Sequence, residues 1–412
     1  MEVTNASPDA AKLALVRVGT RAIVVSCGLD PVVTLDRQGR VVYLIRRGRT
    51  YHRGLDGTIV EKTLTEGGLP VARLVAGAKV RESLVADCCL TVDDVCGAAV
   101  RGLRGTAVLG HQGVADPLTD LQAWLEHRSI RTAADHNLDT ERFGEVYDPV
   151  PVLPPDQYLA LVLEAATGCP WNACRFCTLY AGRHYNVRSP AEFAAHLEKV
   201  LAFIGAGLSY RRSVFLGDAS LSRIRPETLA DRVFFAKTAL AAAGSSEQWS
   251  FHAFADAFTP AAWSAHSLSK LVPLGFRRFH IGVETGCQAL LDAVHKPQSP
   301  AKVVELFRNL KAAGLAVGCI LLVGLGGRAF AERHTADTLA LVERLPLDSE
   351  DLVYLSPLAG DTTVHYSGGA FSEPLNPVEL SAQEARLREG LRVLRGTRRF
   401  QLARYDLEQF VY

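Results

Sequence analysis

From about residue 156 onward, the sequence alternates between short apolar runs and longer amphipathic segments, and this alternation restricts the fold more than any other feature. The short runs have the length of buried strands, and the longer segments repeat apolar residues every three or four positions, as helices do. The predicted strands are 159–163, 214–216, 249–254, 278–283, 315–323 and 351–356, and the predicted helices are 189–205, 226–243, 260–272, 300–313, 332–344 and 374–395. Repeated strand–helix units form parallel sheets, open or curled into a partial or full barrel. In either form, the chemistry belongs at the carboxyl ends of the strands.

Several of these helices have well-defined starts in the sequence. Ser189 can cap the first helix, Pro190 suits its first position, and Glu192 completes a capping box. The pairs Thr259-Pro260 and Ser299-Pro300 repeat the cap-plus-proline pattern. These starts support the predicted helix positions independently of periodicity.

The first 100 or so residues follow a different rhythm. The apolar runs 22–26, 31–35 and 41–45 predict strands, with a hairpin loop at 36–39, and residues 118–127 predict a short helix. Residues 139–156 contain four prolines and little helical periodicity, which is typical of a linker. The predicted division is a β-rich N-terminal domain at 1–150, a strand–helix domain at 151–365, and a C-terminal helix and tail packing on the core at 366–412.

Charge and hydropathy restrict the partners. The 45 Lys and Arg residues nearly balance the 44 Asp and Glu residues, so no broad positive field favours nucleic acid, and a small-molecule substrate is expected instead. The start of the chain lacks the pattern of a signal peptide, and the longest apolar run, 315–327, is too short to cross a membrane. These features predict a cytoplasmic protein with no membrane partner. Nine cysteines in such a chain indicate thiols that are reduced or bound to metal.

Three of the cysteines are clustered directly after the first predicted strand of the second domain. Cys169, Cys174 and Cys177 have the spacing C-x4-C-x2-C on a loop that contains Gly168 and Pro170. Three thiolates on an iron–sulfur cluster would leave one iron open, as a catalytic centre needs. Zinc with a distant fourth ligand and plain thiols are the alternatives. A second metal site is conceivable at Cys88, Cys89 and Cys96, but buried thiols explain these three residues better. Positions in the core are expected for Cys287 and Cys319.

The run GCPWNACRFC resembles the cluster-binding signature of the radical S-adenosylmethionine (radical SAM) superfamily, with one more residue between the first two cysteines than the common C-x3-C-x2-C form. The resemblance extends over about residues 159–357. It implies a partial (βα)6 TIM-like barrel core beside the smaller β-rich N-terminal domain. It also implies one [4Fe-4S] cluster on Cys169, Cys174 and Cys177, and SAM as cosubstrate.

The resemblance further implies which residues meet SAM. Phe176 takes the place of the aromatic residue before the last cysteine, and Gly217-Asp218 stands where the family has a motif for the methionyl amino group. Glu284 corresponds to the ribose contact and Lys296 to a basic residue near the SAM carboxylate. Gly324 lies in the segment that passes the adenine. Ordinary turns are the alternative explanation for the two glycines, and simple packing is the alternative for Phe176.

The substrate site is predicted from strand parity. His252, Asp256 and His280 fall on faces of predicted strands that stay polar, and Tyr354 is a further candidate to line the interior. A buried histidine is also common as an ordinary core group. Arg183, Arg188, Arg211 and Arg212 are expected to be solvated, although residues 180–188 are close enough in sequence to cover the site.

The resemblance implies an oxidoreductase that cleaves SAM reductively and abstracts hydrogen from an unidentified small molecule, with electrons from a donor such as flavodoxin or ferredoxin. No further cysteine follows Cys319, which argues against auxiliary clusters at the C-terminus. A non-catalytic iron–sulfur or zinc protein for electron transfer or sensing is the alternative from another class.

Overall fold

The structure, a computed structural model, describes residues 13–64, 70–111, 113–244, 248–259, 263–358 and 373–412. The chain divides into two compact units. The first contains Met1–Tyr147, Leu201–Arg211 and Val411–Tyr412, and the second contains Asp148–Val200 and Arg212–Phe410. In the described ranges, no helix is both long and apolar enough to cross a membrane.

The first unit is built on an eight-stranded sheet of order β7-β6-β5-β4-β3-β2-β1-β8, in which only the β1–β8 pair is parallel. Its strands are β1 Ala14–Gly19, β2 Ala22–Cys27, β3 Val32–Asp36, β4 Val41–Arg46, β5 Arg49–Arg53, β6 Ile59–Leu64, β7 Pro70–Leu74 and β8 Thr106–His111. Its helices are α1 Ala78–Val100, α2 Pro117–His127 and α3 Ala133–Val146. The three predicted strands, their hairpin loop and the helix α2 are confirmed.

Helix α1 is the main element that the sequence analysis did not predict. Its buried residues include Val85, Cys88, Val92 and Cys96, which repeat at helical spacing and pack on the sheet. Cysteine and alanine at such positions carry a weak apolar signal, so the helical period is hard to see in the sequence. Cys88 and Cys96 are therefore core thiols, and burial raises the pKa of each to about 12.

Helix α3 corrects the predicted linker, because residues up to Val146 are helical and only the chain beyond them is irregular. Thr132 and Asp135 form a reciprocal capping box at its start. The helix buries His136, Asp139 and Phe143. Two of these three core positions are polar, so the apolar periodicity that would have predicted a helix is absent.

The second unit is built on seven parallel strands that follow one another in chain order, with β9 and β17 at the two edges. The strands are β9 Ala160–Leu163, β12 Ser213–Ser220, β13 Phe251–Ala255, β14 Phe276–Glu284, β15 Ala316–Val323, β16 Leu352–Pro357 and β17 Gln401–Arg404. The six predicted strands are confirmed. The seventh strand, β17, was not predicted. The tail was expected only to pack on the core, but after the C-terminal helix it adds this strand to the sheet.

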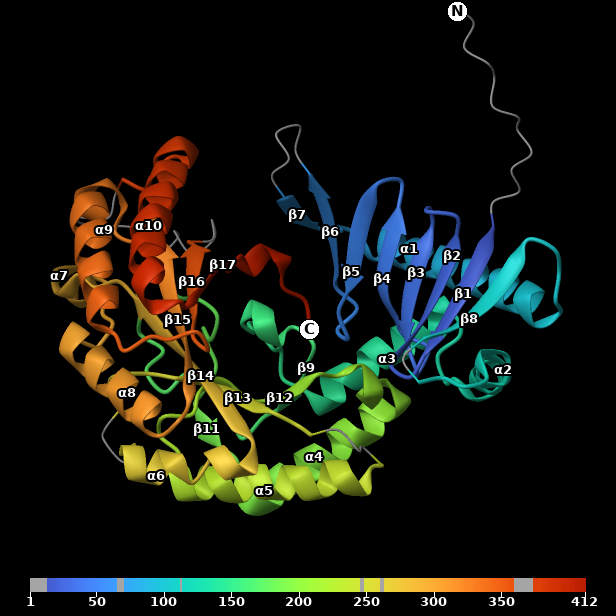
Figure 1. The fold of residues 1–412 in the computed structure, drawn as a ribbon, viewed down its shortest axis with the longest axis horizontal. Coiled ribbons are helices and arrows are strands. Elements are labelled where there is room, and N and C mark those ends of the chain that lie inside the picture. Colours follow the sequence, from blue (N-terminus) through green and yellow to red (C-terminus); the bar gives the residue numbers. More distant parts are fainter. Residues whose placement is uncertain (1–12, 65–69, 112, 245–247, 260–262, 359–372) are drawn as a thin grey trace, which may run out of the picture. The chain divides into compact units, whose positions relative to one another are not determined.

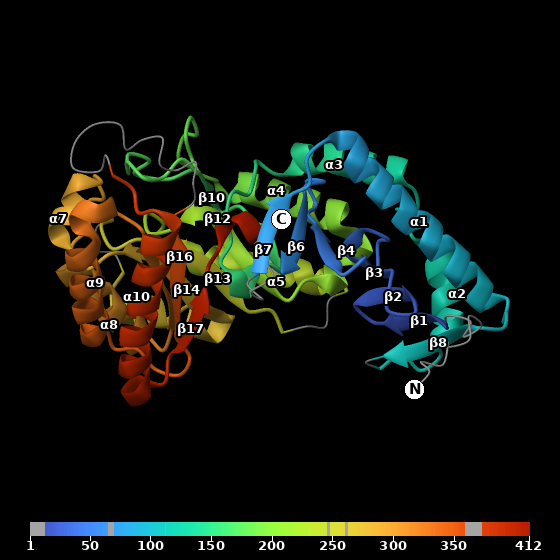
Figure 2. The same cartoon turned by 90° about the horizontal axis from the view of Figure 1, so that it is seen from above.

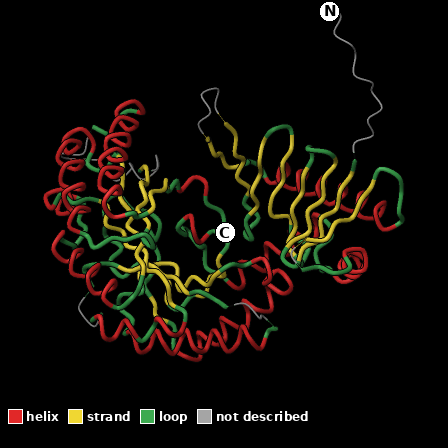
Figure 3. The backbone as a smooth tube through the Cα atoms, in the orientation of Figure 1, coloured by secondary structure: helices red, strands yellow, loops and turns green. Residues whose placement is uncertain are grey.

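The helices of this unit are α4 Pro190–Ile204, α5 Pro226–Ala242, α6 Ala265–Ser269, α7 Gln288–Ala293, α8 Pro300–Ala312, α9 Gly327–Arg344 and α10 Pro377–Arg398. Helices α5, α6, α8, α9 and α10 lie along the outer side of the sheet (Figure 1), and the view from above shows α8, α9 and α10 together on one side of its strands (Figure 2). Figure 3 shows the same layer of helices outside the strands. Loops lie at the opposite face and at the carboxyl ends of the strands.

Some predicted helix boundaries need correction. Helix α6 is much shorter than the predicted segment 260–272 and is capped by Ser264, whereas Pro260 lies outside the described residues. Helix α9 begins at Gly327, five residues before the predicted start. The capping box at Ser189 and the cap-plus-proline pair at Ser299 predicted the starts of α4 and α8 correctly: Glu192 and Ser189 each accept the backbone N–H of the other, and Ser299 accepts that of Lys302. Helix α10 begins at Pro377, three residues after the predicted start.

Candidate functional site

A cavity of about 1120 Å³, counting its solvent-open mouth, lies at the carboxyl ends of the parallel strands. Its lining is Val152, Cys169, Pro170, Trp171, Cys174, Phe176, Cys177, Leu179, Tyr180, Ser220, Phe254, Ala255, Asp256, Phe258, Gly282, Glu284, Lys296, Ile320, Leu322, Ser356, Pro357, Leu358, Tyr405 and Leu407. Most of these side chains are apolar. The few polar ones come from strand ends and from the cysteine loop.

The three predicted metal ligands come together at this cavity. Cys169, Cys174 and Cys177 all line it, and each is partly exposed. Their loop lies between the short paired strands β10 (Ala166–Thr167) and β11 (Asn186–Val187), so its two ends are held together. Three thiols from one loop therefore lie at the wall of one cavity.

Hydrogen bonds to backbone groups fix the shape of the cysteine loop. The indole Nε1 of Trp171 donates to the carbonyl of His295 at 2.7 Å, and the backbone N–H of Arg175 donates to the carbonyl of Val294 at 3.0 Å. The backbone N–H of Asn172 donates to Sγ of Cys169 at 3.3 Å. Such bonds orient a metal ligand before any metal binds.

An apolar cluster surrounds the cysteines. Phe176 packs with Leu290, Val294 and Leu322, and Cys174 and Cys177 lie against this cluster. Phe176 also lines the cavity, so both interpretations of it, packing and cofactor contact, agree with its place. Burial raises the pKa of the Cys174 thiol to about 12, which means that an unliganded thiolate is disfavoured there. A bound cation would supply the stabilisation that the apolar surroundings withhold.

Glu284 and Lys296 form a buried ion pair in the cavity wall, with Nζ 2.6 Å from Oε1. Burial lowers the pKa of Lys296, but the carboxylate of Glu284 outweighs it, and the pKa lies above its ordinary value. A Cβ at Gly282 would lie 2.4 Å from Oε1 and 3.1 Å from Nζ, so the pair needs a glycine at that position. Two residues predicted to meet different parts of SAM are thus neighbours in the wall.

Asp218 lies beneath the cysteine loop and not in the cavity lining. One carboxylate oxygen accepts the backbone N–H of Gly168 at 3.1 Å, and the other pairs with Arg183 at 2.5 Å. The hydroxyl of Tyr180 donates to the Asp218 carbonyl. This fully buried residue therefore ties both ends of the cysteine loop to β12. Its carboxylate is already engaged by these partners, and the preceding Gly217 does not line the cavity either.

Gly324 is also absent from the lining. Its backbone N–H donates to Oε1 of Gln383 on α10 at 2.7 Å, and the nearest side chain is that of Leu380 on the same helix. The residue has the positive φ of a turn, at 89°. Its observed contacts are those of a strand-to-helix turn.

The predicted substrate-site residues separate into two places. Asp256 lines the cavity and accepts a hydrogen bond of 2.5 Å from the hydroxyl of Ser220. His252, His280 and Tyr354 do not line it. They lie lower in the sheet, since each comes three or four residues before the carboxyl end of its strand.

Of the four arginines expected to be solvated, two are only partly exposed and form ion pairs with buried carboxylates, and one is buried. Arg183 pairs with Asp218, Arg188 pairs with the fully buried Glu164 at 2.5 Å, and Arg211 is itself buried; only Arg212 is exposed. Sequence reasoning missed this because each buried carboxylate comes from a distant strand end. It also missed Ser356, at the end of the predicted strand 351–356, and Ser220, which ends β12 four residues beyond the predicted strand 214–216.

Glu164 should make the stability of the protein depend on pH in a way that can be measured. Burial raises the pKa of its carboxyl to about 7, against the opposing charge of Arg188. A folded-state pKa above the unfolded value means that stability is complete below about pH 4.5 and falls as the pH rises through 7. We expect Glu164→Gln to gain stability relative to the parent over this range, by about 3 kcal/mol at most. Urea unfolding at pH 5 and pH 8 measures the change.

The exposed Glu198, on the neighbouring helix α4, supplies the control. The difference in unfolding free energy between Glu198→Gln and the parent should be the same at both pH values. If Glu164→Gln also shows a constant difference, the carboxyl of Glu164 does not carry the predicted dependence.

Comparison with known proteins finds a family match within the second unit. Residues 163–339 match the family model of the Radical SAM superfamily. Among solved structures, coproporphyrinogen III oxidase from Escherichia coli is 15% identical, with a TM-score of 0.42 over 60% of this chain and 53% of that one. Methylornithine synthase is 16% identical, with a TM-score of 0.38 over 75% of this chain and 85% of that one. HydG, a maturase of the [FeFe]-hydrogenase, is 12% identical, with a TM-score of 0.37 over 79% and 71%.

These structural likenesses do not assign a substrate. The chain spans about half the length of the oxidase structure, and all three TM-scores are below 0.5. The comparison with curated proteins found no match.

Proposed function

Residues 163–339 belong to the radical SAM superfamily, and from this premise we propose that the protein is an enzyme with one [4Fe-4S] cluster on Cys169, Cys174 and Cys177. When bound, the cluster and SAM supply a one-electron cleavage that produces a 5′-deoxyadenosyl radical able to abstract hydrogen from an unreactive carbon. The observation that carries the proposal is the meeting of three thiols from one loop at the wall of one cavity. Three protein sulfurs leave a fourth iron without a protein ligand.

The surroundings of the three cysteines support this assignment. Phe176, Leu290 and Val294 place an apolar surface against Cys174 and Cys177 on one side of the cluster site. Asp218 holds the loop through Gly168 and Arg183 at two places, which limits the movement of the segment that carries the three sulfurs. The sequential order of seven parallel strands supports an open, partial barrel as the frame that places these groups at one end.

Glu284 and Lys296 are the residues that we assign to SAM. Nζ of Lys296 has donor capacity beyond its bond to Glu284, and both side chains face the cavity that the cysteines line. Lys296 would bind the carboxylate of SAM, and Glu284 would bind a hydroxyl of its ribose. Both charged side chains would then keep a partner when SAM is bound. Phe176 provides an apolar wall beside Lys296, whose Nζ lies 5.9 Å from the ring centre.

The remaining cavity wall indicates the kind of substrate. Ser220 and Asp256 place a polar pair at the ends of β12 and β13, whereas Phe254, Phe258 and Leu322 are apolar. This supports a small molecule with one polar group and a large apolar surface. An electron donor such as flavodoxin or ferredoxin would supply the reducing electron.

Anaerobic reconstitution with iron and sulfide tests the proposal. We expect a brown protein with a broad absorption band near 400 nm. The electron paramagnetic resonance spectrum of its reduced cluster should shift when SAM is added, and 5′-deoxyadenosine should form under reducing conditions. A colourless protein with stoichiometric zinc at the cysteines, or a cluster whose spectrum ignores SAM, would contradict it and favour a non-catalytic metal protein.

A further inference from the structure

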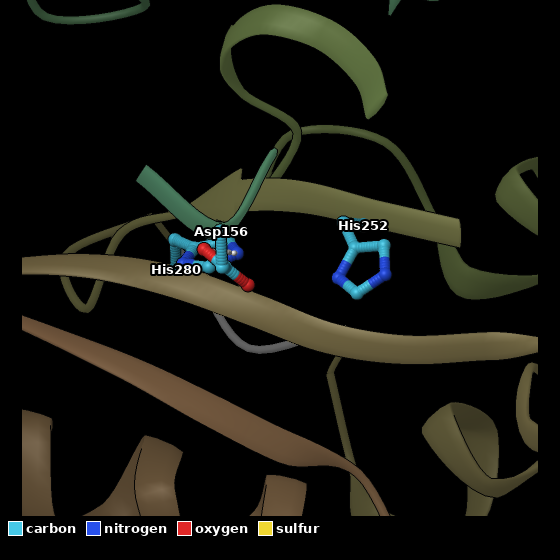
Figure 4. Close-up of side chains that lie close together, drawn as sticks. All are labelled: Asp156, His252 and His280. Atoms are coloured by element: carbon cyan, nitrogen blue, oxygen red, sulfur yellow. Dashed lines mark ion pairs between the residues drawn. The ribbon is translucent and has the colours of Figure 1, made fainter. Parts of the chain in front are cut away.

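Two histidines and an aspartate meet at a place separate from the cavity. Asp156 lies in the turn before β9, His252 on β13, and His280 in the middle of β14 (Figure 4). One ligand atom from each lies within 4.8 Å of the other two. His280 is fully buried and His252 is 6% exposed, whereas the side chain of Asp156 is 22% exposed. The group is therefore preformed, with one edge that solvent reaches.

The histidines lack the hydrogen bonds that buried imidazoles normally make. Within the described residues, neither ring nitrogen of His280 has a partner, and neither does Nδ1 of His252. Nε2 of His252 bonds to the hydroxyl of Ser250 at 3.1 Å. A buried polar atom without a partner costs about 1–3 kcal/mol, so three such atoms in one place call for a missing ligand.

The spacing suits a bridging ion. Nε2 of His280 lies 3.8 Å from Oδ1 of Asp156, which is too long for a hydrogen bond. An ion about 2.0–2.2 Å from each atom spans such a gap. A Cβ at Gly318 on β15 would lie 2.2 Å from Nδ1 of His280, so the ring can occupy this position only beside a glycine.

Burial of the histidines and the partners of Asp156 favour the protonation states and orientations in which these residues bind a metal ion. Both imidazoles are buried, and burial favours the neutral form of a histidine, which is the form that binds a metal ion. The carboxylate of Asp156 accepts the Tyr354 hydroxyl at 2.6 Å and pairs with Arg278 at 2.8 Å. These two groups fix its orientation, as outer partners of metal ligands do, although the charge of Arg278 opposes a second cation.

We propose that Asp156, His252 and His280 form a second metal site, which takes one divalent first-row transition ion such as Zn²⁺. Two imidazoles and one carboxylate are a ligand set for such ions, with the remaining position left to water. The ion ties the turn before β9 to the neighbouring strands β13 and β14. It lies outside the cavity lining, so it acts on the frame of the sheet and does not touch the substrate.

Zinc binding to the full-length, cluster-reconstituted protein tests the site. After equilibrium dialysis against buffered Zn²⁺, we expect one zinc per chain, with iron content unchanged and a raised melting temperature. Asp156→Asn and His280→Gln should each weaken zinc binding about a hundredfold or more, since even outer partners of a metal site contribute up to that much. The matched control is His334→Gln, because His334 is equally buried but has partners on both ring nitrogens.

The Cys174→Ala variant separates this site from the cysteine centre. It should still bind one zinc if the histidine site is correct, whatever happens to the iron. Absence of zinc from the parent, loss of zinc in Cys174→Ala, or full retention in both ligand variants would each overturn the proposal. None of these outcomes depends on SAM cleavage, so failure of the proposed function would be seen separately.

Discussion

Replacement of Cys174 with alanine is expected to abolish formation of 5′-deoxyadenosine from SAM and leave the fold intact. Cys174 is one of three sulfurs from the loop that lines the cavity, and two protein sulfurs do not hold a cubane cluster. Its side chain packs against the apolar cluster around Phe176, where alanine keeps the apolar character. The cost in stability should therefore be about 1 kcal/mol. Iron per chain, the reduced-cluster spectrum and the 5′-deoxyadenosine rate measure the result.

Cys287 provides the matched control, because it belongs to the same apolar cluster but is fully buried and does not line the cavity. Cys287→Ala should keep both the iron and the rate. Wild-type product formation by Cys174→Ala would show that the loop is not the cluster site. An equal loss in both variants would instead point to damaged packing.

Much of the second unit could be predicted because strand–helix alternation and helix caps are local properties of the sequence. The cysteine spacing likewise predicted three thiols at one place, since all three lie on one short loop. Glu284 and Lys296 were found through the resemblance, and they pair because helix α7 and the loop after it return the chain to the end of β14 twelve residues later.

The rest of the site depends on contacts that the sequence does not reveal. Strand parity predicted that His252 and His280 share a polar environment, but parity does not give depth along a strand, and both lie below the cavity. Asp218 follows the predicted strand 214–216, as a SAM ligand would, yet its carboxylate forms an ion pair with Arg183. That partner lies 35 residues away, and only the folded loop brings the two together.

Replacement of Lys296 with methionine is expected to weaken SAM binding about a hundredfold and to destabilise the fold. The first effect follows from the loss of a charge-assisted hydrogen bond, worth about 3 kcal/mol. The second follows because Glu284 would remain buried without its partner, at a cost of about 3–5 kcal/mol. The double variant Glu284→Gln/Lys296→Met should recover most of the stability, since it leaves no unpaired charge, but not the affinity. Calorimetric titration of the reconstituted protein with SAM and thermal melting measure the two quantities separately.

Lys311 offers a control that shares the structural role only. It pairs with the buried Asp351 at 2.9 Å, and neither residue lines the cavity. Lys311→Met should therefore lower the melting temperature much as Lys296→Met does, while SAM affinity stays at the parent value. Recovery of affinity together with stability in the double variant would mean that Glu284 and Lys296 only brace the wall. Persistent loss of affinity in a restored fold is the result that assigns the pair to SAM, because a purely structural ion pair leaves no binding deficit once its charges are removed together.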